Sequence, residues 1–204
     1  MSEDKKIHET YNYSYSDRFD FEDLENRRIY INCDIDENVI DSAVYHIFRY
    51  NRLDRDIPAE ERKPIIIYIN TPGGIVTDGY CLIDAIRSSI TPVYTVNIGT
   101  CYSMGFLIFI AGKKRYCMQS STFLCHDGFS GAIDSMNKLR DRVEFETGEM
   151  EEYTMNYIIE QTKITKKQYT ANKRKEWYFY PNEAKELGVT DCIVGVDCDI
   201  YEIL

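Results

Sequence analysis

The sequence lacks any apolar run long enough to cross a membrane. Its longest, residues 106–112, falls far short of the ~20 residues that a membrane-spanning helix needs. The first ten residues are polar and lack the apolar core of an export signal. We therefore expect a soluble, cytoplasmic protein that has no membrane partner.

The sequence also has fewer basic than acidic residues. The chain has 24 Lys and Arg against 34 Asp and Glu, which gives a net charge of -10. Such a surface repels a phosphate backbone, so nucleic acid is not expected as a partner. The one dense basic run is interpreted as a solvated surface; it comprises Lys166, Lys167, Lys173, Arg174 and Lys175.

The seven cysteines form no CxxC pair, and their number is odd. Most lie inside apolar runs, as free buried thiols do, and this favours a reducing compartment. They are Cys33, Cys81, Cys101, Cys117, Cys125, Cys192 and Cys198.

The 204 residues contain no internal repeat and no linker, and they suit one domain. Residues 64–70 and 92–99 are apolar nearly throughout, as in parallel strands that are covered on both faces. Helical spacing marks residues 76–90 and the long segment 133–161. This alternation predicts an α/β fold with a mainly parallel sheet. Residues 1–27 are polar, acidic and rich in tyrosine, and we expect them to be flexible.

A serine stands where a buried strand turns into a helix. The strand ends at Gly99, and a helix is expected to begin near Ser103, in the segment Tyr102-Ser103-Met104-Gly105. A serine at such a turn is exposed at the sheet edge, beside the free N–H groups of a helix N-terminus. Ser103 is thus a candidate nucleophile, although a plain helix N-cap explains the segment equally well.

Only three histidines could serve as a general base. His8 lies in the polar tail, and His46 lies within a helical pattern beside apolar residues. His126 follows a short apolar strand and enters a loop, which suits a residue that lines a cleft. If a Ser–His pair operates here, His126 is its base.

Two glycines end the strand 64–70, in the segment Asn70-Thr71-Pro72-Gly73-Gly74. Glycines after a strand let the backbone approach a ligand with its N–H groups. The order and the separations of three segments resemble the Clp protease proteolytic subunit family. They are this segment, Cys101-Tyr102-Ser103-Met104-Gly105 and Leu124-Cys125-His126. The similarity runs from Arg28 to about Asp191.

The resemblance implies a catalytic site and a fold. The fold is that shared by Clp proteases and crotonases, with mainly parallel sheets, crossover helices and a protruding handle helix. Ser103 matches the family's nucleophile and His126 its base. The backbone of Met104 and of Gly73 or Gly74, with Gly74 favoured, matches the oxyanion hole. No metal or cofactor is implied.

The third member of the triad departs from the family's pattern. The family usually has an aspartate about seven residues before a Glu-Ala pair, which here is Glu183-Ala184. That offset falls on Glu176, a longer carboxylate whose reach to His126 differs from that of aspartate. Asp127 is a poor substitute, since neighbouring side chains on a strand point to opposite faces.

The family resemblance also implies how substrates bind and how subunits assemble. Gly128, Phe129, Ser130 and Gly131 match the segment that pairs with extended polypeptide substrates. Residues 128–161 as a whole match this substrate strand and the handle that joins two stacked heptameric rings into a homo-oligomeric tetradecamer. Residues 28–204 would form one peptidase domain. Residues 1–27 correspond to the axial gate loops, which contact an AAA+ unfoldase.

Several alternatives remain open at this point. Because of Glu176, the chain could be a catalytically weak or inactive structural subunit. Phage relatives that mature capsids as proteases share the same motifs. Crotonase-like acyl-CoA enzymes also use two backbone donors as an oxyanion hole, but they need no Ser–His pair. A Ser–Lys dyad would use Lys113 or Lys114, which fall in a predicted solvent-exposed turn.

Overall fold

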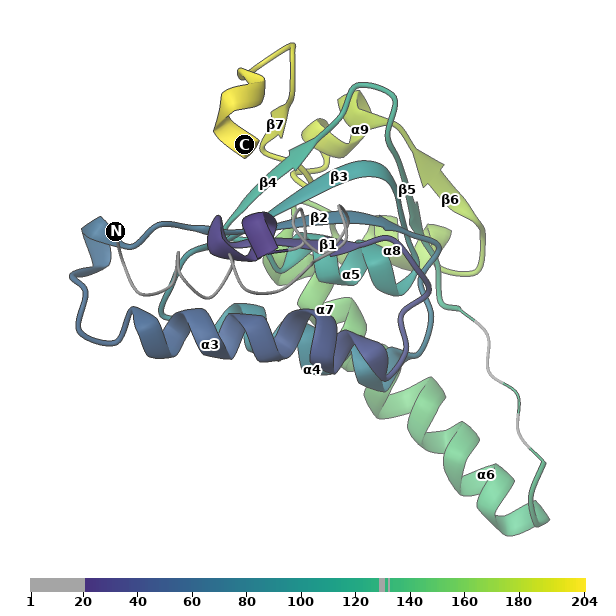
Figure 1. Cartoon of the computed structure of the whole chain (residues 1–204). Helices are drawn as coiled ribbons and strands as arrows, with labels where there is room; N and C mark the ends of the chain where they lie inside the picture. The colour runs from purple at the N-terminus through teal and green to yellow at the C-terminus, as the bar shows by residue number, and fades with distance from the viewer. Residues whose placement is uncertain (1–20, 129–130, 132) are drawn as a thin grey trace.

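The central sheet of the computed structural model is mainly parallel, and helices α3, α4 and α5 lie along one of its faces (Figure 1). The structure describes residues 21–128, 131 and 133–204. Five parallel strands follow the order β1-β2-β3-β4-β7, and β5 joins β3 while β6 runs antiparallel to β5. The predicted α/β class is confirmed. The strands are β1 Arg28–Ile31, β2 Ile65–Thr71, β3 Val93–Tyr102, β4 Lys114–Cys117, β5 Thr122–Cys125, β6 Trp177–Phe179 and β7 Cys192–Ile193.

The helices under the sheet build the main core. The π-helix η1 (Ile40–Val44) continues into α3 (Tyr45–Leu53), and α4 spans Val76–Ser88. Helix α5 (Met104–Ile110) is apolar all round, and each of its residues is buried. A helix with this composition is stable only inside a core, so α5 fixes the turn that precedes it at the centre of the molecule.

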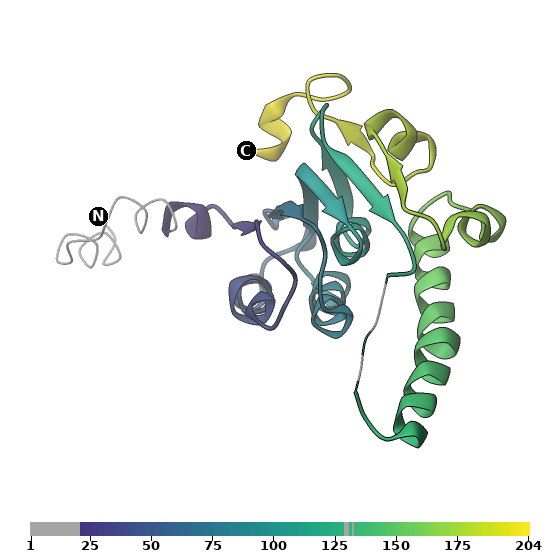
Figure 2. The same cartoon turned by 90° about the vertical axis from the view of Figure 1, so that its right-hand side faces the viewer.

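The predicted long helix is present, and it begins at Met136. Helix α6 (Met136–Phe145), the π-helical turn η3 (Glu146–Met150) and α7 (Glu151–Gln161) follow one another without a break. No residue of α6 or η3 is buried, whereas the end of α7 packs on the core. Accordingly, α6 projects from the body of the subunit (Figures 1 and 2). Among the described helices, none is long and apolar enough to cross a membrane.

The remaining helical segments are short. A 3-10 turn η2 (Ala59–Glu61) lies between α3 and β2. After the handle come α8 (Lys166–Asn172), which begins with a capping box at Thr165, and α9 (Pro181–Glu186), which has proline in its first turn. The chain ends in a 3-10 helix, η4 (Ile200–Ile203).

Strand β3 has two partners on the side away from β2. Its first half pairs with β4, and its last three residues pair with β5, with Tyr102 opposite Leu124. Between the halves the register with β2 slips, since Ile69 faces Asn97 but Thr71 faces Cys101. The buried Asn97 side chain bridges the fork by donating from Nδ2 to the Thr122 carbonyl at 2.9 Å. The fork leaves the end of β3 free to form a second, smaller arm with β5 and β6.

An ion pair ties the start of the described chain to the body. The guanidinium of Arg27 donates to both carboxylate oxygens of Asp54, at 2.5 and 2.6 Å. Asp54 is fully buried and also accepts a hydrogen bond from Thr91 at 2.6 Å. Residues 21–27 are therefore held against α3, where Tyr50 donates to the Leu24 carbonyl at 2.6 Å. Residues 1–20 lie outside the described residues, so the predicted flexible gate segment stays a prediction there.

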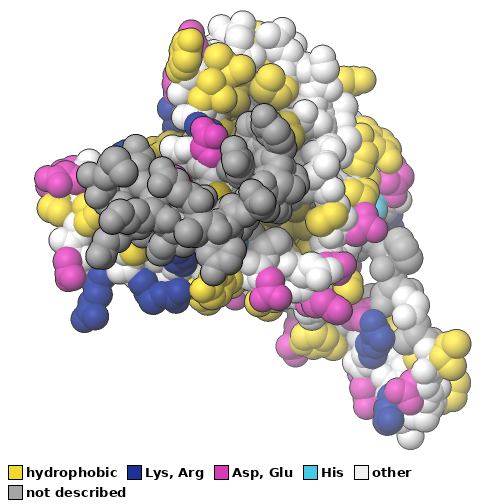
Figure 3. Space-filling model, viewed as in Figure 1, with side chains coloured by type: hydrophobic (Ala, Val, Ile, Leu, Met, Phe, Trp, Pro, Cys, Tyr) yellow, Lys and Arg dark blue, Asp and Glu magenta, His cyan; other side chains and the backbone are white. Residues whose placement is uncertain are grey.

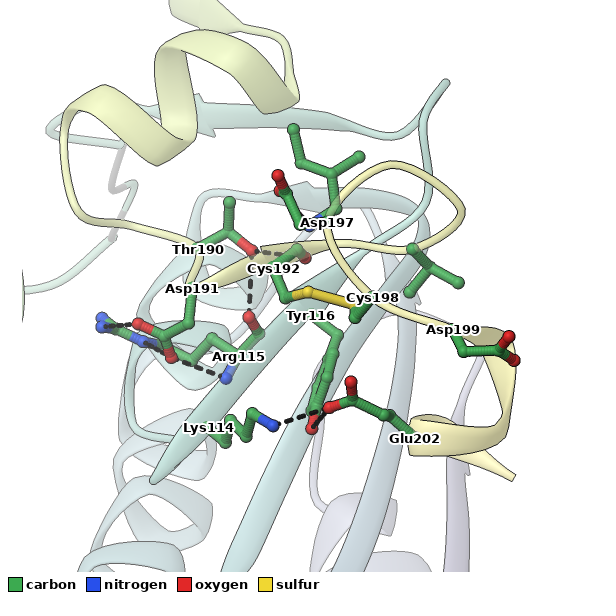
Figure 4. The surroundings of a disulfide bond; sticks show 12 residues. Lys114, Arg115, Tyr116, Thr190, Asp191, Cys192, Asp197, Cys198, Asp199 and Glu202 are labelled. Atoms are coloured by element: carbon green, nitrogen blue, oxygen red, sulfur yellow. Dashed lines mark hydrogen bonds and ion pairs between the residues drawn. A yellow bond between two sulfur atoms is a disulfide. The ribbon is translucent and has the colours of Figure 1, made fainter.

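A disulfide corrects one expectation from the sequence. Cys192 and Cys198 are joined, with their Cα atoms 6.3 Å apart (Figure 4), so the prediction of free thiols is wrong for this pair. The chain between them reverses at Gly195, which has φ +79°, and this brings the two cysteines together. No CxxC signal marks such a loop. The other five cysteines are free.

Candidate active site

Ser103 occupies the turn between β3 and α5 in a strained conformation. Its φ is +52° and its ψ is -117°, a region that residues with a side chain rarely adopt. Two anchors impose it. The Ser103 amide donates to the Leu124 carbonyl at 3.0 Å, which continues the sheet, and its own carbonyl accepts from Phe106 at 3.0 Å, which begins the helix. The turn has the strand–serine–helix geometry that typifies nucleophile elbows.

Two backbone N–H groups lie beside this turn. Met104 is the first residue of α5, so its N–H has no acceptor within the helix. Gly73 approaches closely: a Cβ on it would stand 2.7 Å from Cβ of Ser103 and 3.1 Å from the Met104 nitrogen. No residue with a side chain fits there, because Gly73 also has φ +105°.

The two glycines differ in whether their backbone N–H groups are already engaged. The Gly73 amide already donates to Oγ1 of Thr71 at 3.2 Å. Gly74 forms a parallel bridge with Ile35, whose two hydrogen bonds use the Gly73 carbonyl and the Ile75 amide. Among the described residues that bridge leaves the Gly74 amide without an acceptor, as an oxyanion donor requires.

His126 and Glu176 meet across the antiparallel pair β5–β6. The register sets Cys125 opposite Trp177, and its next step sets His126 opposite Glu176. Directly opposed residues have Cβ atoms about 4.5–5.5 Å apart, a gap that a glutamate can bridge. Nδ1 of His126 lies 2.9 Å from Oε1 of Glu176. The extra methylene therefore does not prevent the carboxylate from reaching the imidazole.

The other ring nitrogen of His126 has no partner. Its Nε2 atom is buried and makes no hydrogen bond within the described part of the chain. Oγ of Ser103 is accordingly not hydrogen-bonded to it in this structure. Catalytic hydrogen bonds are often long in structures without substrate, and Nε2 is the atom that a nucleophilic serine would need.

Two tyrosines support the exposed carboxylate, a role that was not predicted for either of them. The side chain of Glu176 is 59% exposed, and its second oxygen, Oε2, lies 3.4 Å from the Tyr178 hydroxyl. The Tyr178 ring packs edge-on against Tyr102, whose hydroxyl bonds Oγ1 of Thr122 at 2.8 Å. The pKa of Tyr178 is raised, by desolvation and then by the charge of Glu176, so the hydroxyl remains a donor. The i, i+2 spacing of Glu176 and Tyr178 on one strand could have signalled this contact.

The other candidate nucleophiles and bases are poorly suited to catalysis. Cys101 and Cys125 are buried; burial raises the pKa of Cys125 to about 12 and that of Cys101 well above its usual value. A buried thiol of this kind is inert. Burial and then the neighbouring Arg49 lower the pKa of His46, which lies on α3. Lys113 and Lys114 lie beside Val93 and Tyr94 at the beginning of β3, whereas Ser103 follows the end of that strand. Neither lysine is therefore placed to form a Ser–Lys dyad.

The segment after His126 is open. Gly128 (φ +72°) and Gly131 have no heavy atom within 4 Å of the position that a Cβ would take, and neither lies in a strand. Phe129 and Ser130, predicted with them to bind substrate, lie outside the described residues. An open backbone next to the histidine could accept an extended peptide. Among the described residues, no group of three His, Cys, Asp or Glu could hold a metal ion.

Comparison with known proteins finds similarity over most of the chain. The sequence model of the Clp protease family matches residues 16–197. The chain is also similar to the ATP-dependent Clp protease proteolytic subunit 2 of Treponema pallidum (strain Nichols), with 28% identity over 182 residues. That alignment covers 87% of this chain and 86% of the relative.

Proposed function

Because this chain belongs to the Clp protease family, we propose that it is a serine endopeptidase that uses Ser103, His126 and Glu176. The observation that carries the proposal is the state of His126. Its Nδ1 is held by Glu176 at 2.9 Å, while its buried Nε2 has no hydrogen-bond partner among the described residues. This is the arrangement that a general base needs before it takes the proton of a serine.

The mechanism is acyl transfer. Nε2 of His126 takes the proton of Ser103 as Oγ attacks the peptide carbonyl, and Glu176 stabilises the imidazolium that forms. The N–H groups of Met104 and Gly74 bind the oxyanion of the tetrahedral intermediate. The imidazolium then protonates the leaving amine. In the second half, His126 activates a water that hydrolyses the ester on Ser103.

Substitution of the nucleophile tests this proposal. We expect Ser103→Ala to abolish hydrolysis of small fluorogenic peptides and labelling by a fluorophosphonate. Ser120→Ala, at an exposed serine in the turn between β4 and β5, is the matched control and should retain both. Labelling of Ser103→Ala at the wild-type rate would overturn the assignment of the nucleophile.

A second candidate function is that of a weak or inactive structural subunit. Two observations favour it: Glu176 is largely exposed, and Ser103 makes no hydrogen bond to His126. Active-site titration separates the two candidates, since an active peptidase gives close to one acylated serine per chain, whereas an inactive subunit gives none.

Assembly and partners belong to the same proposal. We expect polypeptide substrates, stacked heptameric rings of this chain, an AAA+ unfoldase partner and a cytoplasmic location. The exposed α6, which carries Met136 at 81% and Val143 at 55% exposure, supports subunit contacts through the handle. Sedimentation as a monomer at all concentrations would contradict the ring assembly.

A further inference from the structure

The C-terminal segment, residues 198–204, covers a second apolar cluster, on the face of the sheet opposite the main helices. The cluster includes Tyr68, Val96 and Tyr116, and Ile203 of η4 completes it at 4% exposure. Hydrophobic side chains gather over this part of the molecule, at the top of Figure 3. Among the described residues, this segment therefore covers an apolar face of the sheet that would otherwise be open to solvent.

Few contacts hold this cover in place. Glu202 accepts from Nζ of Lys114 at 2.7 Å and from the Tyr116 hydroxyl at 3.2 Å (Figure 4). The Tyr68 hydroxyl donates to the Ile203 carbonyl. Both members of the Lys114–Glu202 pair are more than 40% exposed, so water and salt compete with it. In the preceding loop, Asp197 also pairs with Lys185 at 2.6 Å and accepts from the Ile193 amide at 3.0 Å. The disulfide is the covalent member of this set of contacts.

This covalent contact is the disulfide between Cys192 and Cys198. Cys192 is anchored in β7 and is 7% exposed, whereas Cys198 is partly exposed at the start of the segment. Gly195 donates to the Cys198 carbonyl at 2.8 Å inside the same loop. One cysteine thus belongs to the sheet and the other to the cover, and the bond between them links the two directly.

We propose that Cys192–Cys198 is a reversible thiol–disulfide site that takes a dithiol reductant, and that its reduction releases the C-terminal cover from the sheet. A thiolate of the reductant attacks Sγ of Cys198, the more exposed of the two residues, and forms a mixed disulfide. The bond between the two cysteines breaks, and Cys192 leaves as a thiolate that takes a proton. The second thiol of the reductant then displaces Cys198, which also takes a proton, and the reductant ends as its own disulfide. Two electrons and two protons pass to the protein.

Reduction would expose a surface that is aromatic and continuous with one already open. Tyr68 stacks on Tyr30 at 4.7 Å between ring centroids, and Tyr30 is 50% exposed. Loss of Ile203 from the cluster would extend this exposed patch across β2 and β4. The redox state of the loop therefore controls how much apolar surface this face presents.

Thiol titration and digestion of the C-terminus test the proposal on the full chain. Unfolded without reductant, the wild type should titrate five thiols, and seven after treatment with dithiothreitol. In the native protein, carboxypeptidase should release the C-terminal residues at least about tenfold faster after reduction, because the loop no longer restrains the segment. Binding of an apolar dye should rise in parallel.

A cysteine variant and a matched control separate this effect from general destabilisation. Cys198→Ser should be digested rapidly with or without reductant, whereas Cys81→Ser, which removes an exposed free thiol, should behave as the wild type. The wild type with and without reductant is itself a test that needs no variant. Seven thiols in the unreduced protein, or equal digestion rates in both redox states of the wild type, would overturn the proposal.

Discussion

Glu176→Gln removes the charge of the third triad residue and keeps its length. The carboxylate touches Nδ1 of His126 at 2.9 Å, so the charge centres of an imidazolium and this carboxylate stand about 4 Å apart. Charges at that distance attract by about 1 kcal/mol in water and about 4 kcal/mol near a protein surface. Glu176 is 59% exposed and His126 is 16% exposed, which places the pair between these limits, at about 2–3 kcal/mol.

This energy predicts a loss of about 30- to 150-fold in kcat, since 1.36 kcal/mol corresponds to a factor of ten. The loss is smaller than the roughly 10⁴-fold that follows the same change of a buried triad aspartate in chymotrypsin-like proteases. Steady-state hydrolysis of a fluorogenic peptide measures it. Glu186→Gln, at an exposed carboxylate of α9, is the control.

Two results would refute the reasoning. A loss below about threefold would mean that water replaces the carboxylate fully, and that the contact seen here has no part in catalysis. A loss equal to that of Ser103→Ala would mean that the pair acts as if it were buried. Glu176→Asp would then report the role of reach, because it keeps the charge and shortens the side chain.

The remaining predictions concern strain, burial and close approach. Ser103→Gly should abolish activity yet raise the free energy of unfolding by about 1 kcal/mol, because glycine accepts φ +52° without strain. Thermal unfolding should show a Tm about 2–4 °C higher, and an equal rise in Ser103→Ala would contradict this. Asp54→Asn should lower the free energy of unfolding by about 3 kcal/mol in urea titrations, since Arg27 would lose its buried partner. The hydrogen bond to Arg27 holds the pKa of Asp54 below its ordinary value, so the wild type should keep this stability above about pH 4 and lose it on further acidification. Asp54→Asn should lack that acid-dependent loss, and a parallel pH dependence in both proteins would contradict the role of the ion pair. Gly73→Ala should reduce kcat at least about tenfold, because its Cβ would press on Ser103, and wild-type kcat would show that the turn can yield.

Local patterns predicted much of the fold. Composition predicts β2 and β3, since both are apolar runs. Helical spacing predicts α4 and the long helix that contains α6 and α7. Strand β6 was missed because three residues are too few for a period to appear. The basic run that includes α8 indicated only a solvated helix face or loop, so the helix itself was not predicted. The disulfide escaped notice because its closure depends on the reversal at Gly195, a tertiary property.

The candidate site divides in the same way. The turn at Ser103 is local, so its sequence predicted a strand followed at once by a helix. The contact between His126 and Glu176 joins residues 50 positions apart, and only the register of β5 and β6 decides whether a glutamate reaches. The support from Tyr178 follows from that same register. The family resemblance predicted which residue is the third triad member, Glu176. Only the strand pairing shows that its carboxylate reaches Nδ1 of His126.

The fork in β3 has a consequence for local stability. His126 directly follows β5, and Glu176 directly precedes β6. These strands have only four and three residues, and they leave the main sheet where β3 changes partners. Short ladders with exposed hydrogen bonds open more readily than the centre of a sheet. Amide hydrogens of β6 should therefore exchange well before those of β2. The arm that holds the base could open and close again as a unit while the body of the subunit stays folded.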